Sequence, residues 1–146
     1  DMIEQVRSTG AAIRLISDGD VAGVMHCAES EITGIDMYMG IGGAPEGVLA
    51  AAALDSFGCY FQGKFLFDTE DSINRAKNMG IADIGKKYEI KDIIKGDSIF
   101  CATGITSGDL VNGVKIKGNK YITETLITHK SSNLNKIIVQ EDTIKT

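Results

Sequence analysis

A glycine-rich loop at residues 40–47 is the feature that most restricts what this chain can fold into. The loop reads Gly-Ile-Gly-Gly-Ala-Pro-Glu-Gly and lies between an apolar, strand-like stretch at residues 35–39 and an alanine-rich, helix-like stretch at residues 48–57. Glycines allow backbone N–H groups to turn towards an anion, and the start of a following helix adds positive potential. The pattern therefore predicts a strand, a phosphate-binding loop and a helix in succession.

One acidic residue, Glu46, lies inside this loop. Its carboxylate would repel a phosphate unless a cation lay between them, so one interpretation is a divalent metal ion that bridges Glu46 and a phosphorylated ligand. The other interpretation is that Glu46 lies in the first turn of the helix and stabilises it through the helix dipole. The loop by itself leaves both interpretations open.

The composition indicates one domain and argues against several classes of partner. The chain has 146 residues, of which 43% are hydrophobic, and this is enough for one domain with a core. Its net charge is -5 and it has no long run of Lys and Arg, so we expect no nucleic-acid partner. No apolar stretch approaches the roughly 20 residues of a membrane span, and we expect a cytoplasmic protein without a membrane partner.

The three cysteines, Cys27, Cys59 and Cys101, are widely spaced and form no C-x-x-C pair. This spacing argues against a disulfide framework and against a zinc site. We therefore expect three reduced core residues. The two histidines, His26 and His129, have no second histidine at ligand spacing, so we expect structural or surface roles for both.

The first part of the chain contains two units of the same kind. Residues 12–16 read as a strand, residues 17–20 as a polar turn and residues 21–28 as a helix, and the glycine loop with its flanking segments forms the second unit. Two such units side by side predict a parallel sheet whose loops gather at its carboxyl edge. We therefore expect the turn at residues 17–20 and the glycine loop to face one ligand.

The second part of the chain changes character. A Gly-Asn pair at residues 118–119 between alternating segments predicts a hairpin, and hence an antiparallel portion of the sheet. The predicted fold class is α/β, with a mixed β-sheet flanked by helices. The further elements expected are a strand at residues 59–67, a helix at 68–79, and strands at 98–102, 114–117, 121–129 and 136–139.

Two polar loops could contact a ligand. The turn Asp18-Gly19-Asp20 can accept hydrogen bonds from sugar hydroxyls, although Asx-turn and helix-capping roles explain the same residues without a ligand. The loop at residues 103–109 is rich in Thr, Ser and Gly and could contact a phosphate or a hydroxyl, or serve as a plain connection. A dinucleotide site is not indicated, because Pro45 replaces the final glycine of that fingerprint.

In this order and spacing, the motifs resemble those of the class II fructose-1,6-bisphosphatases of bacteria. The resemblance implies a lithium-sensitive-phosphatase type of fold, a layered α/β sandwich in two halves. Residues 1–146 are similar to the C-terminal half, and the N-terminal half is absent from this chain. The motifs that carry the resemblance are Asp18-Gly19-Asp20, residues 40–47, residues 102–110, residues 76–81 and residues 123–126.

The resemblance also implies an activity, which is metal-dependent hydrolysis of the 1-phosphate of fructose 1,6-bisphosphate in gluconeogenesis. By position, it implies that Asp18, Gly19, Asp20 and Gly43 contact the substrate and that Glu46 binds a divalent metal ion, Mn²⁺ or Mg²⁺. The other metal ligands, a water-activating hydroxyl and a basic phosphate-binding stretch of the family belong to the missing half. We therefore expect no catalytic residue in this chain and no turnover by it in isolation.

The resemblance names two partners besides the substrate, namely the missing N-terminal half and further copies of the whole enzyme in a homo-oligomer. Two other functions are compatible with the same residues. One is a non-catalytic module that binds a sugar phosphate. The other is a related phosphatase that acts on another sugar phosphate or on a cyclitol phosphate.

Overall fold

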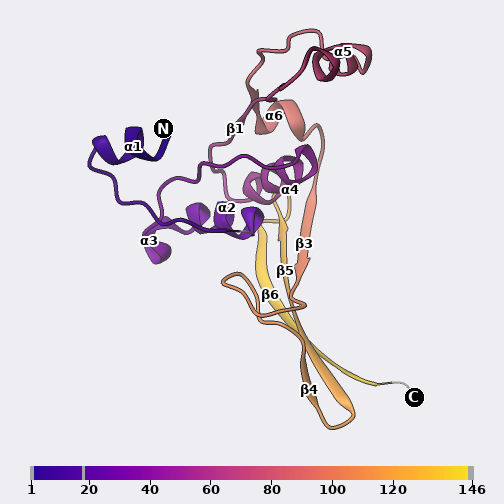
Figure 1. Cartoon of the computed structure of the whole chain (residues 1–146). Helices are drawn as coiled ribbons and strands as arrows, with labels where there is room; N and C mark the ends of the chain where they lie inside the picture. Colours follow the sequence, from indigo (N-terminus) through magenta and orange to yellow (C-terminus); the bar gives the residue numbers. More distant parts are fainter. Residues whose placement is uncertain (1, 18, 145–146) are drawn as a thin grey trace.

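The computed structural model describes residues 2–17 and 19–144. The helices lie together towards one end of the molecule, and the main sheet extends away from them as a long ribbon (Figure 1). The helices are α1 (Met2–Ser8), α2 (Asp20–Ala28), α3 (Ser30–Thr33), α4 (Ala44–Asp55), α5 (Glu70–Asn78) and α6 (Ile90–Ile93). The strands are β1 (Gln62–Gly63), β2 (Tyr88–Glu89), β3 (Ile99–Thr103), β4 (Lys115–Lys117), β5 (Lys120–His129) and β6 (Leu134–Thr143).

Local capping chemistry explains where the main helices begin and end. In α4 a proline occupies one of the first two positions. An N–H group there has no acceptor within the helix, so the helix loses no hydrogen bond to the proline. At the start of α5 the backbone N–H of Ser72 donates to Thr69 Oγ1 at 3.2 Å, and the backbone N–H of Thr69 donates to Ser72 Oγ at 3.3 Å. The predicted helices at residues 21–28, 48–57 and 68–79 correspond to α2, α4 and α5. The start of α4 was predicted too late, because the helix begins at Ala44, inside the predicted loop, where Pro45 favours a first helical turn.

The central strand of the main sheet is β5. It pairs along its whole length with β6 on one side, and on the other side with β3 and β4, all in antiparallel register. The predicted turn at residues 118–119 joins β4 to β5, and Gly118 adopts the left-handed region there with φ of 61°. A separate two-stranded sheet pairs β1 with β2. The fold class of sheets flanked by helices is therefore confirmed.

The parallel portion of the sheet that was predicted for residues 12–16 and 35–39 is not found among the described residues. Both segments run without a strand partner there, and every strand pair is antiparallel. The side chains of Leu15 and Met37 are 66% and 72% exposed. The physical reason is that a strand requires a neighbour to accept its backbone hydrogen bonds, whereas an apolar pattern specifies only a local extended shape. The prediction of a strand over residues 59–67 was also too long, because only Gln62–Gly63 pairs.

The core joins α2 and α4 to the sheet. Ala50, Ala51 and Ala53 of α4 are at most 5% exposed, and these small side chains allow α2 to pack closely beside α4. One buried cluster consists of Met25, Ala53, Phe100 and Leu126, and another of Val24, Ala50 and Leu54. The positions of the starts of α2 and α4, where the predicted ligand-binding residues lie, are thus fixed by packing.

No helix in residues 2–17 and 19–144 combines the length and the apolar character that a bilayer crossing requires.

Candidate functional site

The glycine loop leads directly into α4, as the sequence predicted. Gly43 is the N-cap residue, with an extended backbone (φ −70°, ψ 156°), and its carbonyl accepts the first helical hydrogen bond from the N–H of Gly47 at 3.1 Å. The N–H groups in the first turn of a helix have no partner within the helix, so they can bind an anion. The loop and the start of α4 therefore have backbone geometry compatible with an anion site, and anion binding itself stays a prediction.

The carboxylate of Glu46 turns back over this loop. A Cβ atom placed on Gly43 would collide with Glu46 Oε2, so the carboxylate could keep this position only while residue 43 is glycine. Glu46 lies in the first turn of α4, and within the described residues its carboxylate makes neither a hydrogen bond nor an ion pair. Its position satisfies the helix-dipole interpretation, and its free oxygens also allow it to bind a cation.

The carboxylate of Asp20 reaches the same loop from the start of α2. A Cβ atom placed on Gly42 would lie 2.9 Å from Asp20 Oδ2 and 4.0 Å from the Cβ of Glu46. The two predicted motifs, the acidic turn and the glycine loop, therefore meet in the structure. Gly19, which precedes α2, adopts the left-handed region with φ of 76°. Asp18, also predicted to bind substrate, lies outside the described residues.

Tyr38 is a residue of this site that sequence reasoning missed. Its hydroxyl donates a hydrogen bond to Asp20 Oδ1 at 2.8 Å. Its ring lies against Gly23, where a Cβ atom would be 2.9 Å from Cε2 of the ring. Burial, followed by the hydrogen bond to Asp20 and the charge of Asp20, raises the pKa of Tyr38 to about 12. Tyr38 therefore remains a protonated donor and holds one oxygen of Asp20, which leaves Oδ2 to face the loop.

The sequence signal that could have identified Tyr38 is its position. It lies two residues before the glycine loop, so its side chain is close to any ligand of that loop. The sequence of residues 35–39 is largely apolar, and one tyrosine in such a stretch is commonly a core residue. Only the folded arrangement shows that its hydroxyl reaches Asp20.

The polar loop after β3 is occupied by contacts within the protein. The Asn112 side-chain amide donates to both carboxylate oxygens of Glu124, at 2.8 and 2.9 Å, and the backbone N–H of Asn112 donates to the same carboxylate. These backbone and side-chain donors lower the pKa of Glu124. The backbone N–H of Gly113 donates to Ser107 Oγ at 3.0 Å, which closes the loop. The interpretation of residues 103–109 as a connection accounts for these contacts.

Gly104→Ala is expected to destabilise the chain by about 3 kcal/mol, the upper part of the range for overpacking. Gly104 is buried, and an added Cβ would collide with the carbonyl oxygen of Asn112 and lie 2.8 Å from its carbonyl carbon. These are backbone atoms of a segment tied to Glu124, so they cannot move freely. Urea unfolding measures the effect, with Gly108→Ala as the control because nothing lies within 4 Å of its added Cβ. Equal midpoints for the two variants would contradict the expectation.

The two histidines contact side chains of the protein, and the three cysteines form no disulfide among the described residues. His26 Nε2 lies 3.6 Å from Asp109 Oδ2, which also pairs with Arg14 at 3.0 Å. His129 is hydrogen-bonded to Asp97 and to Ser132. The cysteines are free thiols, with Cys27 and Cys59 half-buried and Cys101 exposed. The prediction of three core cysteines is therefore wrong for Cys101, because it lies on β3 with its side chain directed away from the buried cluster.

The described residues do not supply a full set of ligands for a metal ion. No group of three or more His, Cys, Asp and Glu residues that could hold a metal ion occurs within residues 2–17 and 19–144. Carboxylate oxygens such as those of Glu46 and Asp20 are the ligands that Mg²⁺ and Mn²⁺ prefer. These two side chains fit one side of an oxygen-coordinated site, and further ligands would have to come from outside the described residues.

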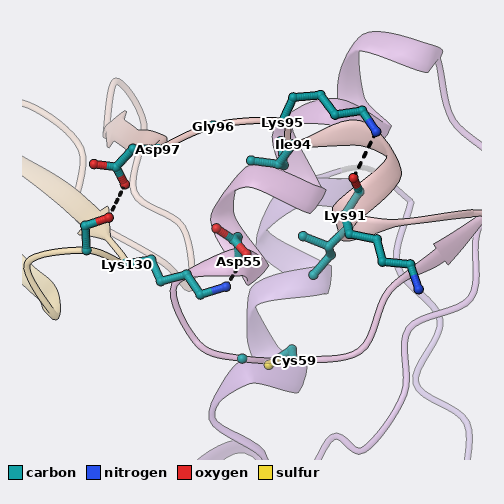
Figure 2. Close-up of a pocket in the computed structure, with 11 residues that line it drawn as sticks. Asp55, Cys59, Lys91, Ile94, Lys95, Gly96, Asp97 and Lys130 are labelled. Atoms are coloured by element: carbon teal, nitrogen blue, oxygen red, sulfur yellow. Dashed lines mark hydrogen bonds and ion pairs between the residues drawn. The ribbon is translucent and has the colours of Figure 1, made fainter.

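A separate cavity of about 590 Å³ lies between α4, α6 and the turn that follows β5 (Figure 2). Lys130 Nζ pairs with Asp55 Oδ1 at 2.8 Å there, and Lys95 Nζ donates to the carbonyl oxygen of Lys91. None of the residues predicted to bind substrate or metal lines this cavity. The candidate site is therefore the group of residues at the start of α4, and not the cavity.

A family model and individual relatives both match this chain, and their names agree. Residues 1–142 match the family described as bacterial fructose-1,6-bisphosphatase, glpX-encoded. A relative from Synechococcus sp. (strain JA-3-3Ab), named D-fructose 1,6-bisphosphatase class 2/sedoheptulose 1,7-bisphosphatase, is 39% identical over 145 residues, covering 90% of this chain and 42% of the relative. A relative of the same name from Trichodesmium erythraeum is 38% identical over 150 residues, covering 94% of this chain and 43% of the relative. The chain thus spans less than half the length of these relatives.

Proposed function

Because the chain belongs to the family of bacterial, glpX-encoded fructose-1,6-bisphosphatases, we propose that it supplies substrate binding and part of the metal site of such an enzyme. The reaction is hydrolysis of the 1-phosphate of fructose 1,6-bisphosphate to fructose 6-phosphate and phosphate, a step of gluconeogenesis. The observation that carries the proposal is the convergence of Asp20 and Glu46 on Gly42 and Gly43 at the start of α4.

Each residue of the site has a role that follows from its atoms. The N–H groups at the start of α4 bind phosphate oxygens, and Gly43 allows the phosphate to approach the backbone. Asp20 accepts a hydrogen bond from a sugar hydroxyl through Oδ2, while Tyr38 holds Oδ1. Glu46 provides a carboxylate oxygen to a divalent cation. When bound, Mn²⁺ or Mg²⁺ supplies positive charge that neutralises the phosphate oxygens and lowers the pKa of a coordinated water.

The remaining ligands are proposed to come from the portion of the enzyme that this chain does not span. The matched relatives carry more than half of their length outside the aligned region. We assign to that portion, the N-terminal half, the other metal ligands and the group that activates water. Residues 1–146 then form the C-terminal domain, and the whole enzyme is a homo-oligomer.

A second substrate is favoured by the names of the relatives, which include sedoheptulose 1,7-bisphosphatase. Both sugars are ketose bisphosphates, and the site recognises a phosphate and adjacent hydroxyls, which both share. A panel of fructose 1,6-bisphosphate, sedoheptulose 1,7-bisphosphate and an inositol phosphate, assayed with the full-length protein, separates these substrates from a cyclitol phosphate. Binding of a sugar phosphate by the full-length protein without any phosphate release would instead indicate a non-catalytic module.

Asp20→Ala in the full-length enzyme is expected to raise KM for fructose 1,6-bisphosphate on the order of tenfold to a hundredfold, because a hydrogen bond to a charged group is lost. Tyr38→Phe is expected to raise KM by about fivefold, because Asp20 keeps its charge but loses its neutral hydrogen-bond donor. Steady-state phosphate release measures both effects, and Tyr60→Phe, at a tyrosine that is 76% exposed, is the control. An unchanged KM in Asp20→Ala would assign Asp20 to the turn alone.

A further inference from the structure

Asn112 and Gly113 form the single Asn-Gly pair in the sequence. They lie in the loop that joins β3 to β4, which leaves the long ribbon and returns to it (Figure 1). Asn112 is exposed and Gly113 is buried. An asparagine deamidates most readily when glycine follows it, because glycine has no side chain to hinder attack by its own backbone nitrogen. The pair is therefore a candidate site of covalent change.

Deamidation of Asn112 needs no reactant other than water. The backbone nitrogen of Gly113 gives up its proton and bonds to Cγ of Asn112, while the bond from Cγ to the side-chain nitrogen breaks and ammonia leaves with that proton. Water then opens the five-membered imide at one of its two carbonyl groups. The product is an aspartate at position 112, or an isoaspartate in which the main chain runs through the side-chain carbonyl.

Both reacting groups are engaged in hydrogen bonds in the folded loop. The side-chain nitrogen of Asn112 donates to both carboxylate oxygens of Glu124, at 2.8 and 2.9 Å, and the backbone N–H of Asn112 donates to the same carboxylate at 2.9 Å. The backbone N–H of Gly113, whose nitrogen is the nucleophile, donates to Ser107 Oγ at 3.0 Å. Closure of the imide ring therefore has to break contacts to Glu124 and Ser107.

The backbone around the pair is tightly packed as well. A Cβ atom placed on Gly113 would lie 2.6 Å from the backbone nitrogen of Ser107. The N–H of the next residue, Val114, donates to the carbonyl oxygen of Ile105 at 3.2 Å. Backbone that is packed and hydrogen-bonded in this way changes its dihedral angles through local opening. The loop thus restrains the rotation that would bring the Gly113 nitrogen to the Asn112 side chain.

The product of deamidation would not fit the contact that Asn112 makes. Glu124 accepts its hydrogen bonds as a carboxylate, and the donors from Asn112 lower its pKa. A carboxylate at position 112 would replace the two side-chain N–H donors by acceptors and would bring a second negative charge next to Glu124. The contact would change from attraction to repulsion, and the loop would open.

We propose that Asn112 is a modification site at which slow deamidation releases the loop between β3 and β4, and that Glu124 and Ser107 restrain this reaction in the folded protein. Local opening of the loop sets the rate, and the loss of ammonia makes the change irreversible.

This proposal does not depend on the proposed phosphatase function. Asn112, Glu124 and Ser107 do not belong to the candidate site at the start of α4. Absence of phosphatase activity would leave the modification site untouched. Failure of Asn112 to deamidate would equally leave the catalytic proposal untouched.

Peptide mass analysis of the full-length protein, incubated at neutral pH, tests the restraint. Trypsin releases residues 96–115 as one peptide, in which Asn112 is the single amide side chain. We expect Asn112 to deamidate on the order of tenfold more slowly in the folded protein than in the same protein unfolded in urea. Glu124→Gln is expected to raise the rate in the folded protein on the order of tenfold, because hydrogen bonds to a charged acceptor are lost.

The matched control is Glu141→Gln, because Glu141 is also a hydrogen-bonded carboxylate of the sheet but bonds Lys120 instead of Asn112. It should leave the rate unchanged. Ser107→Ala, which removes the acceptor of the Gly113 N–H, is a second test that keeps the contact to Glu124, and it should also raise the rate. Circular dichroism shows which variants are folded, and the rates are compared among those.

Three results would overturn the restraint or the site. They are an Asn112 that stays unconverted in urea, equal rates in the folded and unfolded protein, and folded Glu124→Gln and Ser107→Ala variants that both deamidate at the rate of the unmodified protein.

Asn112→Asp reproduces one product and tests the release of the loop. The N–H of Gly104 donates to the carbonyl oxygen of Glu124 at 3.0 Å, and the N–H of Gly113 donates to Ser107. Both are expected to exchange with deuterium faster in Asn112→Asp than in Asn112→Ala, which removes the side-chain donors without adding a charge. Equal exchange in the two variants would show that the new charge does not open the loop, and that part of the proposal would be wrong.

Discussion

Glu46→Gln in the full-length bisphosphatase is expected to lower kcat/KM for fructose 1,6-bisphosphate on the order of a hundredfold or more. This corresponds to about 2.7 kcal/mol of lost transition-state stabilisation. The substitution keeps the size of the side chain but removes the charge that binds a divalent cation. The carboxylate of Glu46 lies over Gly43 and has no hydrogen-bond or ion-pair partner within the described residues, so we expect little effect on folding. Phosphate release measured over a range of Mn²⁺ concentrations should show a higher metal requirement as well as a lower maximal rate.

The control for this prediction is Glu70→Gln, because Glu70 also lies in the first turn of a helix. If Glu46 acted only on the helix dipole, both variants would lose a similar and small amount of stability, about 0.3–1 kcal/mol, with activity retained. Thermal unfolding of the two variants beside the activity assay separates the two interpretations. Full activity of Glu46→Gln at limiting Mn²⁺ would leave the dipole interpretation as the explanation of this residue.

The 146-residue chain by itself is expected to release no phosphate from fructose 1,6-bisphosphate above the uncatalysed background, with or without Mn²⁺. The described residues bring two carboxylates to the loop and contain no group of three or more metal-binding side chains. A site for Mn²⁺ or Mg²⁺ is commonly octahedral, with oxygen ligands, so two side chains do not define it. Without a positioned cation, the negative charge of Asp20 and Glu46 opposes the binding of a doubly phosphorylated sugar.

The measurement is a phosphate-release assay at saturating substrate, with the full-length protein as the positive control in the same buffer. Circular dichroism of the isolated chain shows whether it is folded, so that an inactive chain is not confused with an unfolded one. Turnover by the isolated chain close to that of the full-length enzyme would show that residues 1–146 contain a complete catalytic site. The assignment of the other ligands to the unspanned portion would then be wrong.

The helices of this protein could be predicted from sequence because their signals are local. The Thr69–Ser72 capping box, the proline at the start of α4 and the hairpin turn at Gly118 act within a few residues of one another. Residues 12–16 and 35–39 were predicted as strands from an equally clear apolar pattern. Their pairing depends on neighbours that are far away along a chain, and the described residues provide none. Local chemistry therefore determined the helices. Residues 12–16 and 35–39 do not form strands in the described part of the chain, because no neighbouring strand pairs with them there.

The site was predicted in part for the same reason. Glycine, proline and an acidic residue in one loop predicted an anion-binding helix start, and the structure brings Asp20 and Glu46 to the adjacent residues Gly42 and Gly43. The roles of these residues in binding substrate and metal stay predictions. Tyr38 could not be identified from its apolar surroundings, because its contact with Asp20 joins residues 18 positions apart, with α2 and α3 between them.

The contact between Tyr38 and Asp20 gives the site a built-in optical reporter. The chain has no tryptophan and four tyrosines, so its near-ultraviolet absorbance comes largely from tyrosine. With a pKa of about 12, Tyr38 ionises later in an alkaline titration than an ordinary tyrosine, whose pKa is about 10. Tyr38→Phe is therefore expected to remove the latest step of the absorbance titration, which reports the contact with Asp20 without a label and without turnover.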